Sequence, residues 1–142
     1  AIVSFEAMLS GPAESPPNAS PGIGFAIVDM DTTAHTMRVR AEFSGLVGPV
    51  TVCHIHAATA APFAGTAGVA TPEPTFQGFQ SGGTPLSAEA AFFSAMSTGR
   101  AYFNVHSSTF PGGEIRGFFI PSPGAATVMA LAGLTAIRRR RR

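Results

Sequence analysis

Apolar and polar residues alternate along several short stretches of this chain, which is the pattern of strands that bury one face. The alternation is clearest over residues 37–43, where Met37, Val39, Ala41 and Phe43 are separated by charged residues. Successive side chains of a strand point to opposite faces, so these four residues are predicted to share a buried face. Similar reasoning predicts further strands at residues 3–9, 24–30, 50–57, 68–71, 101–106 and 114–119.

Residues 86–96 carry the one convincing helical pattern inside the body of the chain. Ser87 is suited to cap its N-terminus and Gly99 to end it. Six or seven short strands joined by turns rich in Gly and Pro predict an all-β class. We expect an antiparallel two-sheet sandwich or Greek-key barrel with one short helix.

The pattern changes after Ile120, where Pro121, Ser122 and Pro123 are followed by 14 residues without a charge. As a helix these 14 residues would span about 21 Å, which is shorter than the roughly 30 Å of a bilayer core. The chain then ends in a block of like charges that must stay solvated or meet anionic headgroups. We therefore divide the chain into a β domain at residues 1–119 and a tail with a hydrophobic helix at residues 120–142. The terminal block consists of Arg138, Arg139, Arg140, Arg141 and Arg142.

Charge is distributed unevenly between these two parts. Residues 1–120 contain four Arg and all eight acidic residues, which gives −4, and the five terminal Arg bring the whole chain to +1. An acidic body offers no surface for phosphates, so we expect no nucleic-acid partner. The single cysteine, Cys53, excludes an intrachain disulfide and is expected to be buried.

Four short pieces follow one another along residues 3–119. They are Phe5-Glu6-Ala7-Met8-Leu9-Ser10-Gly11 with the nearby Glu14 and Pro16-Pro17, then Phe43-Ser44-Gly45-Leu46, then His54-Ile55-His56, and finally residues 99–106 (GRAYFNVH) running into residues 110–117 (FPGGEIRG). In this order the four pieces resemble the chordin-type (CHRD) domain. The resemblance implies an immunoglobulin-like or superoxide-dismutase-like sandwich and an exported protein that acts at the cell surface or outside the cell.

The tail resembles the PEP-CTERM sorting signal, which consists of a short proline motif, a hydrophobic segment and a terminal Arg cluster. Here the motif reads Pro121-Ser122-Pro123 where the family has Pro-Glu-Pro. The resemblance implies transient anchoring in the inner membrane, recognition by an exosortase and cleavage near the proline motif. A simple membrane anchor is the alternative, but a stable span normally needs about 20 apolar residues.

Three histidines form a candidate metal site. His54 and His56 are two residues apart on an expected strand and so point to one face, and His106 ends a later strand. If the two strands are neighbours, three imidazoles converge, and imidazole suits both zinc and copper. A superoxide-dismutase-like sandwich also carries copper on a His-x-His strand. The alternative is a structural cluster in which Glu114 or Asn104 accepts hydrogen bonds from the rings.

Glu114 and Arg116 are also two residues apart, and we expect them to form a structural ion pair on the last strand. A catalytic acid at Glu114 is the other interpretation, but the sequence contains no motif that assigns a reaction. The first functional interpretation is therefore a non-enzymatic, exported domain with an adhesion, matrix or other binding role. The second is a copper- or zinc-binding domain, or a redox enzyme, that uses His54, His56 and His106.

Overall fold

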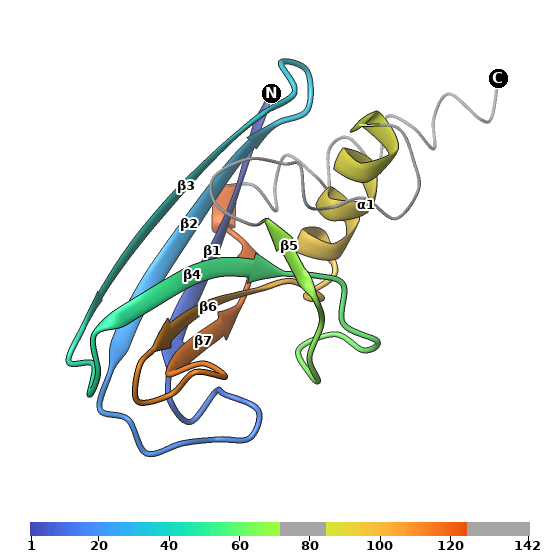
Figure 1. Cartoon of the computed structure of the whole chain (residues 1–142). Coiled ribbons are helices and arrows are strands. Elements are labelled where there is room, and N and C mark those ends of the chain that lie inside the picture. Colours follow the sequence, from blue (N-terminus) through green and yellow to red (C-terminus); the bar gives the residue numbers. More distant parts are fainter. Residues whose placement is uncertain (72–84, 125–142) are drawn as a thin grey trace, which may run out of the picture.

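The computed structural model of the chain describes residues 1–71 and 85–124. Within these residues the protein is a β structure with one helix beside it (Figure 1). The elements are β1 (Ile2–Ser10), β2 (Ile23–Asp31), β3 (Thr36–Ser44), β4 (Val50–His56), β5 (Val69–Thr71), α1 (Pro85–Ser97), β6 (Tyr102–Ser107), β7 (Ile115–Phe118) and β8 (Ile120–Pro121). The predicted all-β class with one short helix is confirmed, and the predicted tail helix lies outside the described residues.

The strands form one curled, antiparallel sheet in the order β3-β2-β1-β7-β6-β4-β5, with β8 paired to β1 (Figure 1). The long strands β1 to β3 form one half of the sheet, and β4 to β7 form the other half. The halves join where β7 approaches β1, at the ladder pair Ser10–Arg116. Gly117 lies there with the backbone of Met8 against its Cα, which leaves no room for a side chain. Because the sheet curls, its halves enclose one core, as the predicted two-layer fold requires.

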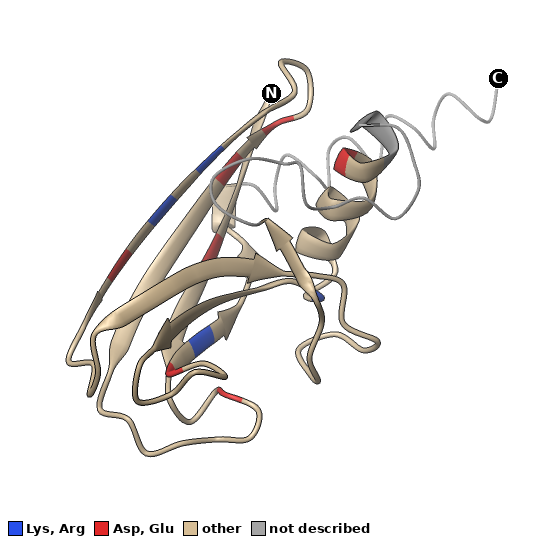
Figure 2. Ribbon diagram, viewed as in Figure 1, with Lys and Arg blue, Asp and Glu red and all other residues tan. Residues whose placement is uncertain are grey.

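The alternation of apolar and polar residues accounts for the first half of the sheet, β1 to β3. Phe5 pairs with Val28, and Val28 with Val39, in an unbroken antiparallel register. Phe5 and Val28 are fully buried, whereas Met8 on the other face of β1 is 73% exposed. Charged residues of both signs follow one another along β3 (Figure 2), and they are exposed to solvent. One face of these strands is therefore core and the other is protein surface.

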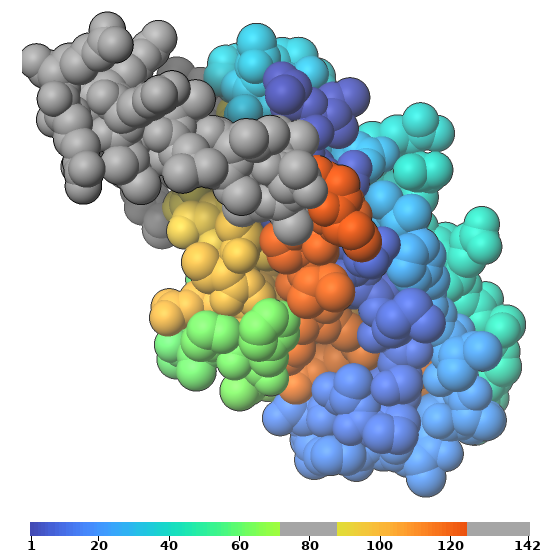
Figure 3. Space-filling model, turned by 180° about the vertical axis from the view of Figure 1, so that it is seen from behind, coloured from blue at the N-terminus to red at the C-terminus, as the bar shows by residue number. Residues whose placement is uncertain are grey.

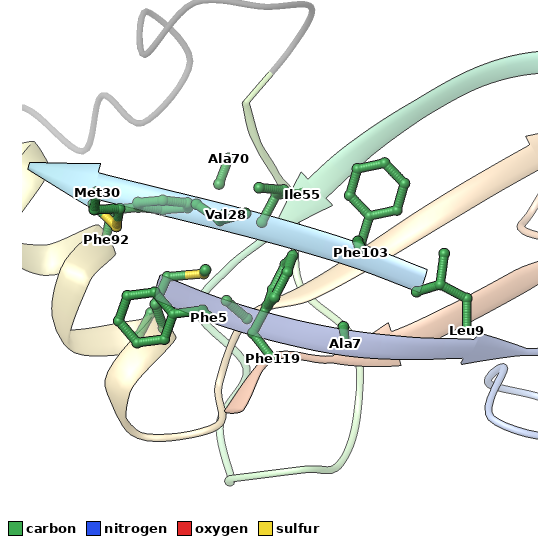
Figure 4. Close-up of a cluster of buried hydrophobic side chains, with 14 of the residues drawn as sticks. Phe5, Ala7, Leu9, Val28, Met30, Ile55, Ala70, Phe92, Phe103 and Phe119 are labelled. Atoms are coloured by element: carbon green, nitrogen blue, oxygen red, sulfur yellow. The ribbon is translucent and has the colours of Figure 1, made fainter. Parts of the chain in front are cut away.

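The core lies between the two halves of the sheet and the helix (Figure 4). Val28 comes from β2, Ile55 from β4 and Phe92 from α1, and each is at most 1% exposed. Phe93 of α1 meets the ring of Phe5 edge to face, with the ring centroids 5.7 Å apart. The helix thus closes one end of the curled sheet.

Helix α1 ends where the sequence predicted, just before Gly99. Gly99 follows α1 with a φ of +68°, a backbone conformation that glycine adopts without strain. Arg100 N–H donates to the carbonyl of Ala95 and closes the last turn of the helix.

Seen from behind, the segment that contains β7 and β8 lies between α1 and β1 (Figure 3). In the part of the chain that the structure describes, no helix has the length and hydrophobicity of a membrane span.

Candidate metal centre

In the half of the sheet made by β4, β6 and β7, the middle strand β6 is buried on both faces. All six residues of β6 are buried, although only alternate ones point into the core. The register places His54, Asn104 and Arg116 in one row across the second face. The adjacent row contains His56, Tyr102 and Phe118. This second face is polar and aromatic, and loops from three parts of the chain cover it.

The three histidines converge on this face, as the spacing of the sequence predicted for neighbouring strands. One ring nitrogen of each lies within 4.8 Å of the corresponding nitrogens of the other two. The ring centroid of His54 is 4.7 Å from that of His56 and 4.7 Å from that of His106. Both contacts are edge to face, so neither ring stacks in parallel on His54.

Two backbone carbonyls fix the orientation of two of the rings. His56 Nδ1 lies 2.8 Å from the carbonyl oxygen of Ala67, and His106 Nδ1 lies 2.8 Å from that of Pro111. A carbonyl only accepts hydrogen bonds, so Nδ1 is the donor and carries the proton. In the neutral ring the lone pair then belongs to Nε2. Backbone carbonyls hold metal-binding histidines in metalloproteins in the same way.

Each of the three rings also has one buried nitrogen without a hydrogen-bond partner. These atoms are His54 Nδ1, His56 Nε2 and His106 Nε2. A buried polar atom without a partner costs free energy, on the order of 1–3 kcal/mol, so three in one place require an explanation. The expected alternative, in which Glu114 or Asn104 accepts hydrogen bonds from the rings, does not occur among the hydrogen bonds of the described residues.

Burial keeps two of the three rings uncharged. Removal from water, with smaller contributions from His56 and His106, lowers the pKa of His54 to about 4. Burial also lowers the pKa of His56, more than the hydrogen bond to Ala67 raises it. The two rings are therefore neutral near pH 7, which is the state of imidazole that binds a metal.

Aromatic and cationic side chains support the cluster from one side. Tyr102 stacks in parallel on His56, with ring centroids 4.8 Å apart. The guanidinium carbon of Arg116 lies 4.7 Å from the centre of the Tyr102 ring. Arg116 also donates hydrogen bonds to the carbonyls of Ala13 and Gly65, so it holds two of the covering loops against the sheet.

The structure differs from the expected ion pair between Glu114 and Arg116. The carboxylate beside Arg116 belongs to Glu14, with a nitrogen–oxygen distance of 3.9 Å and both side chains almost fully buried. Glu114 lies just before β7, which begins at Ile115, so the alternation of a strand does not govern its direction. Arg116 therefore pairs with a loop residue 102 positions away in the sequence.

Glu114 instead fastens loops together at one end of the sheet. Its carboxylate accepts hydrogen bonds from the hydroxyl of Ser20 and the backbone N–H groups of Val47 and Gly48. Burial acts to raise the pKa of Glu114, but these bonds and one from the Ser107 side chain outweigh it, so the pKa is lowered. Glu114 is thus a buried structural carboxylate, which is not the arrangement of a catalytic acid.

Other candidate residues lie away from the cluster. Cys53 packs against the core on the face opposite to the histidines, as its position in the strand predicted, but it is half-buried and not buried as expected. His35, in the turn between β2 and β3, is half exposed and lies 2.8 Å from a carboxylate oxygen of Glu89. The proline motif starts in β8, and Arg138 to Arg142 lie outside the described residues.

The sequence did not single out Glu14 as part of this site, and it named Asn104 only as an acceptor of hydrogen bonds from the rings. The only signal for Glu14 was its place in the first CHRD-like piece, since the loop that contains it has no periodicity. Asn104 lies two residues before His106 and opposite His54, so strand register places it beside two histidines once β4 and β6 are known to pair. Neither the pairing of β4 with β6 nor the packing of the loop that contains Glu14 follows from a local pattern in the sequence.

The architecture and the site define a class: a curled antiparallel β domain with one helix and a buried three-histidine cluster under covering loops. The CHRD domain family matches residues 5–119, which is most of the chain, and the chain belongs to this family. Membership indicates a non-enzymatic, binding-type domain. No curated protein and no solved structure shows a significant match to the chain.

Proposed function

We propose that the domain binds a copper or zinc ion through His54, His56 and His106, as a binding protein and not as an enzyme. The observation that carries this proposal is the set of three buried ring nitrogens without a partner that face one another. Neutral imidazole nitrogens are ligands that both ions favour, and three of them form a recognised zinc arrangement. An ion bound there would use all three lone pairs.

The residues present fit such an ion in chemistry and need a small adjustment in spacing. Bonds of about 2.0–2.1 Å at tetrahedral angles place ligand nitrogens roughly 3.4 Å apart. The nitrogens of the cluster lie within 4.8 Å of one another, so rotations of the side chains that shorten these distances by an ångström or so complete the site. His56 and His106 are already oriented by Ala67 and Pro111. Most of the adjustment therefore falls on His54, the ring without a backbone partner.

Calorimetry of the full chain with Zn²⁺ and Cu²⁺ near neutral pH tests the proposal. We expect one ion per chain, and His56→Ala should abolish binding because it removes one of three ligands. His35→Ala is the matched control, since this half-exposed histidine lies outside the cluster and its loss should leave binding unchanged. No heat with the wild-type protein, or equal binding by His56→Ala, would contradict the proposal.

We also propose that the domain is exported and is displayed on the cell surface or released. There it would serve in adhesion or in a matrix. The tail supports this proposal, because Pro121-Ser122-Pro123, an uncharged segment and five Arg follow one another in the order of a sorting signal. An exosortase and the inner membrane would be its partners during sorting. Intact-mass measurement from a host with an active exosortase should give a mature chain that ends near Pro123, whereas recovery of the full chain would argue against sorting.

A further inference from the structure

The polar face beside the histidines contains two further buried atoms without a hydrogen-bond partner. They are Glu14 Oε1 and Asn104 Oδ1. With the three ring nitrogens they make up all the buried side-chain nitrogen and oxygen atoms of the described residues that lack a partner. Native proteins pair almost all such atoms, so their concentration on one face indicates that the site extends from the histidines to Glu14.

Gly113 shows how closely these two oxygens approach each other. Its φ is +128°, and a Cβ placed on it would lie 2.6 Å from Glu14 Oε1, 2.6 Å from Asn104 Oδ1 and 2.7 Å from Asn104 Nδ2. The Glu14 carboxyl and the Asn104 amide therefore approach the same point, and no more than about twice these distances separates them. The amide suits both forms of Glu14, because its oxygen accepts from a protonated carboxyl and its nitrogen, once the amide turns over, donates to an ionised one.

The charged groups around Glu14 connect it to the histidines. Glu14 Oε2 faces Arg116 of β7 at 3.9 Å, and both side chains are buried. Arg116 lies over Tyr102, which stacks on His56. From β6 the neighbour is Asn104, which lies beside His54 of β4 in the same row. The charge of Arg116 is therefore compensated only when Glu14 is ionised.

We propose that Glu14 is a proton-responsive positioning residue of the metal centre, which holds a proton against Asn104 while the histidines are metal-free and releases it when a cation binds. The inference rests on the proposed metal-binding function. Ionised Glu14 neutralises Arg116 and so lowers the repulsion that a cation meets at the histidines. Coupling between two sites is reciprocal, so the cation favours ionised Glu14 by the same factor.

The titration of Glu14 agrees with this geometry. Burial raises its pKa to about 7, against the opposing effects of Arg116 and of a backbone hydrogen bond from Ser15. The carboxyl is therefore poised to gain or lose its proton near neutral pH. An exposed glutamate would be ionised there and could not respond.

Carbon-13 NMR of the Glu14 carboxyl in the full chain tests the proposal directly, with Zn²⁺ as a diamagnetic probe. Without metal we expect a titration midpoint near pH 7. Saturating Zn²⁺ should lower this midpoint by about one unit, a tenfold coupling of the size typical for linked sites. An unchanged midpoint in the zinc-bound protein would overturn the inference while leaving the metal-binding function intact. Absence of zinc binding would overturn both.

Glu14→Gln provides a second test, because glutamine keeps the shape but cannot ionise. At about pH 8 the variant should bind Zn²⁺ about tenfold more weakly than the wild type, and at about pH 6 the two affinities should converge. A merely structural role would weaken binding equally at both pH values, and that result would overturn the inference. Glu42→Gln, at an exposed glutamate of β3, is the matched control and should change neither affinity.

Discussion

The two halves of the curled sheet are built on different plans. β1, β2 and β3 are nine residues long, pair in an unbroken register and keep one face in solvent. β4, β6 and β7 are shorter, and the second face of this half is covered by loops, so that β6 is buried throughout. The first half therefore contributes to the fold with one face only. The second half has a core face and, behind it, an enclosed polar face.

This difference separates stability from function within one sheet. Every buried side-chain nitrogen or oxygen without a partner in the described residues lies on the enclosed face of the second half. In the first half the apolar residues of one face are buried, and the pair of Arg40 with Asp29 reaches solvent, as do the apolar side chains of Met8 and Ile23. Buried polar atoms without a partner often mark a functional site, and in the described residues they occur only on the enclosed face.

The largest contrast is expected between two arginines that both point away from the core. Arg116→Ala should cost about 3–5 kcal/mol of unfolding free energy, because it leaves Glu14 and two loop carbonyls buried without their partner. Arg40→Ala should cost at most about 0.5 kcal/mol, because its pair with Asp29 is exposed to water. Urea unfolding of both variants measures the difference. Equal costs would mean that the second face is not an enclosed layer.

Two glutamates give a second, somewhat smaller contrast. Glu114→Ala should cost roughly 2–4 kcal/mol, because Ser20, Val47 and Gly48 lose a charged acceptor inside the protein. Glu42→Ala on β3 should stay within about 0.5 kcal/mol, since that side chain is exposed. Thermal unfolding at neutral pH provides the measurement. If Glu114→Ala were as mild as Glu42→Ala, the loops would not depend on this carboxylate.

The difference between the two halves of the sheet also explains which features the sequence could predict. Alternation identified the strands of the first half, because Phe5 and Val28 need only a buried face and a register. It also placed His54 and His56 on one side of β4. The approach of His106 depended on β4 pairing with β6, and the partner of Arg116 depended on a loop without periodicity. Contacts between residues about 100 positions apart are set by tertiary packing, which no local pattern contains.

A third prediction concerns the stability of the metal-free protein in acid, and it depends on His54 on the enclosed face. Burial lowers the pKa of His54 to about 4 from an ordinary value of 6.5. The stability that neutral His54 contributes is therefore present above about pH 6.5 and is lost as the pH falls through about 4. His54→Gln has no such group, so its unfolding free energy should decline less over this range. Glu14, whose pKa is raised, changes stability in the opposite direction over pH 4.5–7 in both proteins and cancels in the comparison. Parallel pH profiles would contradict the prediction.

The smallest effect on stability is expected when the C-terminal residues that follow β8 are removed. Removing residues 125–142 should change the unfolding free energy by less than about 1 kcal/mol, because β8 and the bond from Ser122 N–H to the Ser4 carbonyl remain. Cutting after Phe119 also removes β8, which pairs with β1, and should cost a further 1–2 kcal/mol or so, the value of two or three hydrogen bonds. Urea unfolding of the two truncated chains would separate these steps. A large loss from the first cut would show that the segment beyond Gly124 supports the β domain, and it would then be more than a sorting signal.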